Sequence, residues 1–283
     1  MEGSRALSFT KMHGCGNDFV VVDATRTPFR PTPALLRRLT DRRFGVGCDQ
    51  VLVIEPPSAP DVDFDYRIFN ADGSESGQCG NGARALARYV REAGLSDKDR
   101  IRVRTATSVL ELSRVGGDRY RVDLGPPRLE PADIPFGAAA RAERYALTLA
   151  GGDTVEIGAL SMGNPHAVLL VDDVDSAPVA GIGAALQAHP AFPQSVNVGF
   201  LQVLSRERAR LRVYERGVGE TLACGSGACA AAVIGQLWGR LGAAVDMELR
   251  GGTLRIEWQG EGQPVFLTGP AETVFRGEIE WAS

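Results

Sequence analysis

Residues 75–85 read Glu-Ser-Gly-Gln-Cys-Gly-Asn-Gly-Ala-Arg-Ala, and residues 220–230 read Glu-Thr-Leu-Ala-Cys-Gly-Ser-Gly-Ala-Cys-Ala. Six of the eleven positions agree at an offset of 145 residues. A looser repeat places Gly16-Asn17 before residues 19–22 and Gly163-Asn164 before residues 167–171. Two copies at such a spacing indicate a duplication and not a solenoid. We therefore expect an α/β fold with two similar halves, each bringing one cysteine to a shared cleft.

Each repeated cysteine, Cys79 or Cys224, comes just before a predicted helix. Residues 80–94 carry apolar side chains at helical spacing, and Gly94 suits the C-terminal cap. Residues 228–238 are small or apolar almost all round, which is typical of a helix buried on every side. Other expected elements are a surface helix over 33–43 and short strands over 19–22, 51–54, 62–68 and 167–171.

Length and composition limit the class of protein. At 283 residues two domains are the better expectation, and Pro126-Pro127 suggests a crossing between the halves near residue 126. The net charge of −4 offers no basic surface for nucleic acid. No segment has the roughly 20 apolar residues that span a bilayer, and no signal peptide is seen, so we expect a cytoplasmic protein without a membrane partner.

The five cysteines are free thiols in this interpretation. They stand at positions 15, 48, 79, 224 and 229, an odd number without a CxxC pair. That pattern favours neither a disulfide framework nor a zinc site, so no metal is expected.

A thiol at a helix N-terminus lies beside unpaired backbone N–H groups and the positive end of the helix dipole, which favours its thiolate. Glycines at 80, 82, 225 and 227 let the backbone approach an anion such as a carboxylate. Two such thiols suit proton removal from one face of a stereocentre and delivery to the other. The sequence thus predicts a two-base epimerase that needs no cofactor, with Cys79 and Cys224 as the acid/base pair.

Seven motifs support a more specific hypothesis. They are residues 11–19 (KMHGCGNDF), 44–50 (FGVGCDQ), 69–73 (FNADG), 79–84 (CGNGAR), 161–166 (SMGNPH), 213–217 (VYERG) and 223–230 (ACGSGACA). In this order they resemble the diaminopimelate epimerase family along nearly the whole chain.

The resemblance implies an isomerase that interconverts LL- and meso-diaminopimelate on the route to lysine, without a cofactor. It also implies two pseudo-symmetric domains, each a curved sheet wrapped around a central helix, with the active site in the cleft between them. Because the C-terminal segment of the family returns to the first domain, the expected domains are 1–125 plus 270–283, and 126–269. A homodimer is expected, although Phe275 stands where many members have a tyrosine at the dimer contact.

Site residues are carried over by motif. The substrate-binding positions implied are Asn17, Gln50, Asn70, Gly80, Asn81, Asn164, Asn197, Glu215, Arg216, Gly225 and Ser226. His166 and Glu215 match residues that tune the cysteines, and His13 and His189 are interpreted as structural. Cys229 is interpreted as packing, and Cys15 and Cys48 as passive thiols.

Two alternatives remain open at this point. A proline or hydroxyproline racemase would use the same paired cysteines on a smaller substrate, for which Asn70, Asn197 and Arg216 would be superfluous. A non-catalytic, redox-responsive binding protein would instead join Cys79 and Cys224 in a disulfide. Exchange of the substrate α-hydrogen with solvent separates an epimerase from a binding protein.

Overall fold

A computed structural model describes residues 5–77 and 79–281 of the chain. It divides into two compact units, the first running to Val122 and resuming at Gly269, the second comprising Asp123–Thr268. Residues 1–4, 78 and 282–283, which the domain and repeat predictions include, lie outside the described part.

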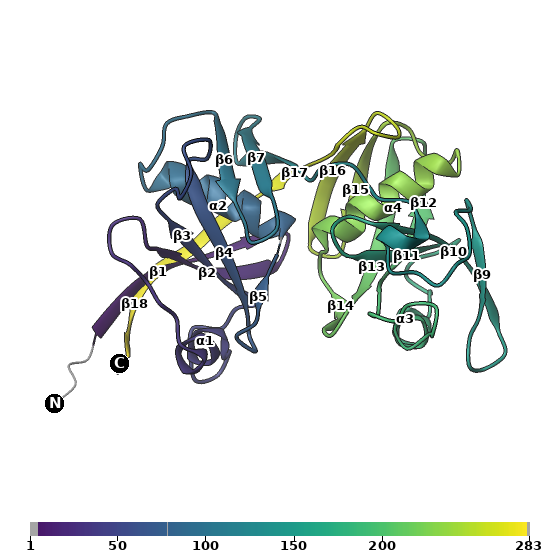
Figure 1. The fold of residues 1–283 in the computed structure, drawn as a ribbon, viewed down its shortest axis with the longest axis horizontal. Helices are drawn as coiled ribbons and strands as arrows, with labels where there is room; N and C mark the ends of the chain where they lie inside the picture. The colour runs from purple at the N-terminus through teal and green to yellow at the C-terminus, as the bar shows by residue number, and fades with distance from the viewer. Residues whose placement is uncertain (1–4, 78, 282–283) are drawn as a thin grey trace. The chain divides into compact units, whose positions relative to one another are not determined.

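The first unit builds its sheet from strands of both ends of the chain (Figure 1). Its elements are β1 (Arg5–Gly14), β2 (Asn17–Asp23), α1 (Pro33–Thr40), β3 (Gln50–Glu55), β4 (Phe64–Asn70), β5 (Glu75–Ser76), α2 (Gly80–Glu92), β6 (Arg100–Arg104), β7 (Val109–Arg114), β8 (Arg119–Asp123) and β18 (Glu272–Trp281). β1 pairs antiparallel with both β2 and β18, β2 runs parallel to β3, and β4 runs antiparallel to β3 and parallel to β6.

The second unit repeats this order of strand directions. Its elements are η1 (Pro131–Asp133), β9 (Tyr145–Thr148), β10 (Thr154–Ser161), β11 (Pro165–Leu170), α3 (Val179–Gln187), β12 (Asn197–Val203), β13 (Arg208–Glu215), β14 (Gly219–Thr221), α4 (Gly225–Leu237), β15 (Ala244–Leu249), β16 (Gly252–Trp258) and β17 (Val265–Pro270). β11 runs parallel to β12, and β13 runs antiparallel to β12 and parallel to β15. The mixed α/β class predicted from the sequence is confirmed, and the common topology agrees with a duplicated half.

Each half contains one central helix. α4 contacts strands β10–β13, β15 and β16, and residues 227–235 within it are all buried, as its small and apolar sequence predicts. α2 contacts β1, β2, β3, β7 and β18, and it buries one apolar face that includes Leu86 and Val90. Gly94 adopts a φ of +65° just beyond α2, the left-handed conformation that suits a glycine at a helix end.

Element boundaries differ from the expected ones by a few residues. α1 ends at Thr40 and not at 43, because the carboxylate of Asp41 accepts the backbone N–H groups of Arg43 and Phe44 and starts a turn. α4 begins three residues earlier than expected, directly after Cys224. Within the described ranges no helix is long and apolar enough to cross a membrane.

Candidate active site

The two repeated cysteines cap their helices in the same way. Cys79 has backbone angles φ −147° and ψ 106°, and its Sγ accepts the N–H of Gly82 at 3.3 Å. Cys224 has φ −120° and ψ 113°, and its Sγ accepts the N–H of Gly227 at 3.3 Å. Each sulfur thus takes the place of the oxygen of a usual N-cap side chain. The repeat found in the sequence is a repeat of this cap.

The glycine three residues after each cysteine leaves room for its sulfur. A Cβ added at Gly82 would lie 3.4 Å from the Sγ of Cys79, and 2.3 Å from the hydroxyl oxygen of Tyr66. A Cβ added at Gly227 would lie 3.2 Å from the Sγ of Cys224. The C-G-x-G pattern therefore has a steric reason at its last position.

In the first unit, the amide side chain of Asn17 lies beside Cys79. The Sγ of Cys79 lies 3.9 Å from Oδ1 of Asn17, and Nδ2 of Asn81 donates to the same oxygen at 3.2 Å. On β3 and β4, which pair at these residues, Nε2 of Gln50 donates to Oδ1 of Asn70 at 2.9 Å. The structure thus brings Cys79, Asn81 and Asn17 together, and joins Gln50 to Asn70.

In the second unit, Cys224 is 5% exposed and lies beside a carboxylate. Burial raises the pKa of its thiol well above the usual value, and the charge of Glu215 raises it further. Hydrogen bonds with Ser226 and Gly227 lower the pKa and so act in the opposite direction. The Oγ of Ser226 lies 3.6 Å from the sulfur. The N–H groups of the helix start favour the thiolate, as the sequence predicts, but desolvation outweighs them at this position. Glu215 in turn accepts the hydroxyl of Thr221 at 2.5 Å.

His166 is neutral in this unit. Burial first, and the charge of Arg216 second, lower its pKa to about 3. Its Nε2 lies 2.9 Å from Oδ1 of Asn164. His166 therefore has no positive charge with which to stabilise a thiolate near neutral pH, and any effect on Cys224 must come through hydrogen bonding or packing.

Asn197 holds the backbone around this histidine. Its Oδ1 accepts the backbone N–H of Arg216 at 2.9 Å, and its Nδ2 donates to the carbonyl of Pro165 at 3.2 Å. The guanidinium of Arg216 donates to the carbonyl of Gln194 at 3.0 Å. Asn197 also pairs with His166 between β12 and β11, just as Gln50 pairs with Phe19 between β3 and β2.

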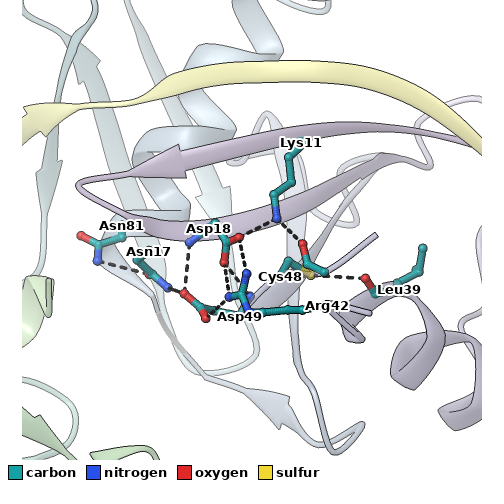
Figure 2. A network of polar contacts seen from close by, with 9 residues as sticks. Lys11, Asn17, Asp18, Leu39, Arg42, Cys48, Asp49 and Asn81 are labelled. Atoms are coloured by element: carbon teal, nitrogen blue, oxygen red, sulfur yellow. Dashed lines mark hydrogen bonds and ion pairs between the residues drawn. The ribbon is translucent and has the colours of Figure 1, made fainter. Parts of the chain in front are cut away.

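The sequence interpretation missed a group of charged residues behind Asn17. Asp49 accepts Nδ2 of Asn17 at 2.8 Å, and Arg42 donates to both Asp49 and Asp18 (Figure 2). Lys11, almost buried, forms an ion pair with Asp18 at 2.6 Å. The sequence offered one indication of this group. Asp18 follows Asn17 and Asp49 precedes Gln50, each inside one of the quoted motifs.

Comparison with known proteins decides the family. The family model described as diaminopimelate epimerase matches residues 9–130 and 158–274. The chain belongs to this family. Diaminopimelate epimerase of Chromobacterium violaceum is 57% identical over 274 residues, 97% of this chain and 99% of that protein. The enzyme of the same name from Ectopseudomonas mendocina is 56% identical over 273 residues, 96% of this chain and 99% of that protein. The predicted resemblance is confirmed, and the chain is an isomerase.

Solved structures place the family in a wider fold group. A hydroxyproline epimerase from Agrobacterium vitis, with bound trans-4-hydroxy-L-proline, covers 100% of this chain and 95% of its own, with a TM-score of 0.74 and 14% identity. A probable proline racemase from Agrobacterium radiobacter covers 96% of this chain and 92% of its own, with a TM-score of 0.69 and 15% identity. At these identities the likeness shows the two-domain fold alone, so it does not favour the racemase alternative.

Proposed function

We propose that Cys79 and Cys224 are the acid/base pair with which this member of the diaminopimelate epimerase family inverts one stereocentre of diaminopimelate, in lysine biosynthesis. The observation that carries the proposal is the twin cap, in which two cysteines of a duplicated fold hold the same position at two helix N-termini. A packing role alone would not require a sulfur at both positions.

The reaction is a proton transfer through one carbon. A thiolate removes the α-proton from one face of the substrate and becomes a thiol, while the opposite thiol donates its proton to the other face and becomes a thiolate. In the reverse direction the two cysteines exchange these roles. The mechanism requires both sulfur atoms to reach the same α-carbon from opposite faces.

Negative charge develops beside the substrate carboxylate as the α-proton leaves. The backbone N–H groups at the starts of α2 and α4 can stabilise that charge, since they belong to the first helical turns. We assign this role to the first helical residues, Gly80-Asn81 in α2 and Gly225-Ser226 in α4. No metal and no cofactor takes part in the proposed reaction.

Cys224 is suited to start as the proton donor. Burial and the charge of Glu215 raise its pKa, so the substrate-free enzyme holds this sulfur as a thiol. Glu215 accordingly tunes Cys224 towards the protonated form. For His166 we propose a tuning role through its hydrogen bonding, because its imidazole is neutral.

Polar side chains of both units are proposed to bind the substrate. A ligand with two ammonium and two carboxylate groups needs a partner for each buried charge. In the first unit the proposed contacts are Asn17, Gln50, Asn70, Gly80 and Asn81. In the second unit they are Asn164, Asn197, Glu215, Arg216, Gly225 and Ser226.

We propose further that the enzyme works in the cytoplasm as a homodimer. Support for the dimer comes from β18, where Val274 and Phe275 are 55% and 46% exposed. Large apolar side chains exposed on one strand are compatible with a protein contact. The ring of Phe275 also packs edge-on against that of Phe9, with the centroids 6.0 Å apart.

The test is exchange of the substrate α-hydrogen in deuterated water, followed by NMR. Cys79→Ala and Cys224→Ala are each expected to lower the rate of epimerisation by about a hundredfold or more, as the loss of a general acid or base does. Cys229→Ala is the matched control, because this buried cysteine lies on α4 outside the proposed machinery.

Three outcomes would contradict the proposal. Unchanged epimerisation in either variant would remove that cysteine from the mechanism. Turnover of proline and not of diaminopimelate would favour the racemase alternative. Binding of diaminopimelate without deuterium exchange in the wild-type protein would favour the binding protein.

A further inference from the structure

The charged residues behind Asn17 form a continuous set of contacts (Figure 2). Nδ2 of Asn17 donates to Oδ2 of Asp49 at 2.8 Å, and Arg42 donates to Oδ1 of Asp49 at 2.7 Å. Arg42 also donates to both carboxylate oxygens of Asp18, at 2.9 and 2.8 Å. Burial raises the pKa of Asp18, but hydrogen bonds from Arg42 and Lys11 outweigh it and hold the pKa below its ordinary value. The charged carboxylate of Asp18 thus holds Arg42, and Arg42 holds Oδ1 of Asp49, the oxygen that Asn17 does not contact.

A second set of contacts reaches Asn17 from the other side. Arg84, which is fully buried, donates from Nη2 to Oδ1 of Asn81 at 3.0 Å and from Nε to the carbonyl of Pro270 at 3.2 Å. Since Asn81 receives this bond at its oxygen, its Nδ2 is left to donate to Oδ1 of Asn17 at 3.2 Å. The hydrogen bonds therefore run in one direction, from Arg84 through Asn81 and Asn17 to Asp49.

The two ends of this chain fix the orientation of the amides. A guanidinium can only donate hydrogen bonds, and a carboxylate can only accept them. Turning the Asn17 amide by 180° would place its oxygen against the Asp49 carboxylate and its NH₂ group against the NH₂ group of Asn81. Both contacts would be repulsive, so Asn17 is held with Oδ1 towards Asn81 and Cys79.

The orientation of Asn17 bears on the chemistry of Cys79. Its Oδ1 lies 3.9 Å from the sulfur, where it accepts a hydrogen bond from the protonated thiol. An acceptor at this place stabilises the thiol relative to the thiolate, so it increases the tendency of the sulfur to take up a proton. The opposite amide orientation would present a donor and favour the thiolate.

We propose that Asp49 is a positioning residue that locks the Asn17 amide with its oxygen towards Cys79, and thereby strengthens Cys79 as a base. The inference rests on the proposed acid/base role of Cys79. Asp49 does not touch the sulfur and acts only through Asn17.

The second half of the fold lacks this device. At the 145-residue offset of the central helices, Arg84 corresponds to Cys229 and Asn81 to Ser226. At the 147-residue offset that relates Asn17 to Asn164, Asp49 corresponds to the buried Val196. The lock therefore distinguishes the environment of Cys79 from that of Cys224 within an otherwise duplicated site.

Asp49→Asn is the informative variant, because this side chain is 44% exposed and its replacement leaves the core intact. Asparagine has one acceptor oxygen for three donors, namely Nδ2 of Asn17, the guanidinium of Arg42 and the backbone N–H of Asp18. Asp41→Asn is the charge-matched control: Asp41 is also exposed, and an asparagine can still accept the N–H groups of its own turn.

The readout is the pH profile of Cys79 alkylation by iodoacetamide, resolved by peptide mass spectrometry at 0.1 M and 1 M salt. In Asp49→Asn we expect more thiolate, with alkylation below the midpoint about threefold faster and the midpoint about half a pH unit lower at both salt concentrations. Asp41→Asn should match the wild type. The kcat of Asp49→Asn should fall by up to about threefold, the most that a half-unit loss of Cys79 basicity can cause.

An unchanged alkylation profile in Asp49→Asn would overturn the inference. A shift that disappears at 1 M salt, where the screening length is about 3 Å, would also overturn it, because the cause would then be the lost charge and not the amide. These outcomes are independent of the proposed function. If Cys79→Ala stayed active the acid/base role would fail, whereas the alkylation profile would still report the orientation of Asn17.

Discussion

Replacing Gly82 with alanine would test how closely the start of α2 is packed around Cys79. The new Cβ would lie 2.3 Å from the hydroxyl oxygen of Tyr66, a contact that requires movement of a fully buried ring. Overpacking of this kind costs about 1–3 kcal/mol. Alanine in place of glycine within a helix returns up to about 1 kcal/mol. We therefore expect the free energy of unfolding to fall by about 1–2 kcal/mol.

The companion variant Tyr66→Phe removes only the clashing oxygen. Within the described part of the chain this buried hydroxyl has no hydrogen-bond partner, so its removal alone should be neutral or stabilise by about 1 kcal/mol. In the double variant Tyr66→Phe/Gly82→Ala the steric cost should disappear and the helix gain should remain. The double variant is then expected to be at least as stable as the wild type.

The free energy of unfolding is measured with urea for the wild type, both single variants and the double variant. The rate of epimerisation is measured on the same four proteins, because it depends on where the Cys79 sulfur lies. Gly82→Ala should lose activity together with stability, because relieving the contact with Tyr66 displaces the backbone N–H of residue 82, which Cys79 accepts. Two results would refute the reasoning: a Gly82→Ala protein as stable as the wild type, or a double variant no more stable than Gly82→Ala.

Two further predictions concern other parts of the molecule. Because burial lowers the pKa of His166 from 6.5 to about 3, the unfolded chain binds an extra proton between these values, so stability is lost as the pH falls from 6.5 towards 3. His166→Gln should reduce the slope of unfolding free energy against pH by up to about 1.4 kcal/mol per unit, measured by urea unfolding; equal slopes would contradict it. Phe275→Asp should shift the sedimentation coefficient from that of a dimer to that of a monomer. Leu204→Asp is the control, because the side chain of Leu204 is similarly exposed, and this variant should stay dimeric. A Phe275→Asp protein that remains a dimer would refute the β18 contact.

The sequence was most informative where its pattern and its local geometry coincide. The repeat around Cys79 and Cys224 predicted two helix starts, and the structure has both cysteines at the N-caps. The small and apolar residues after Cys224 predicted a helix buried all round, which α4 is. These features depend on neighbours within a few positions of the chain, so a one-dimensional pattern is enough to find them.

Properties that depend on distant residues were not predictable in this way. The proton affinity of Cys224 is set mainly by its burial and by Glu215, and the local pattern at the helix start reveals neither. The contact of Asp49 with Asn17 joins residues 32 positions apart, across the parallel pairing of β2 and β3. Strand pairing decides which polar groups meet, and no spacing rule supplies it.

The pairing of β18 with β1 has a consequence for synthesis. Strand β1 is made first, but one of its two neighbours is made only after the whole second unit, Asp123–Thr268, has been translated. The second unit is continuous in sequence and can fold co-translationally. The half that carries Cys79 therefore cannot complete its sheet until β18 has been translated, and until then one edge of β1 is unpaired and open to intermolecular pairing.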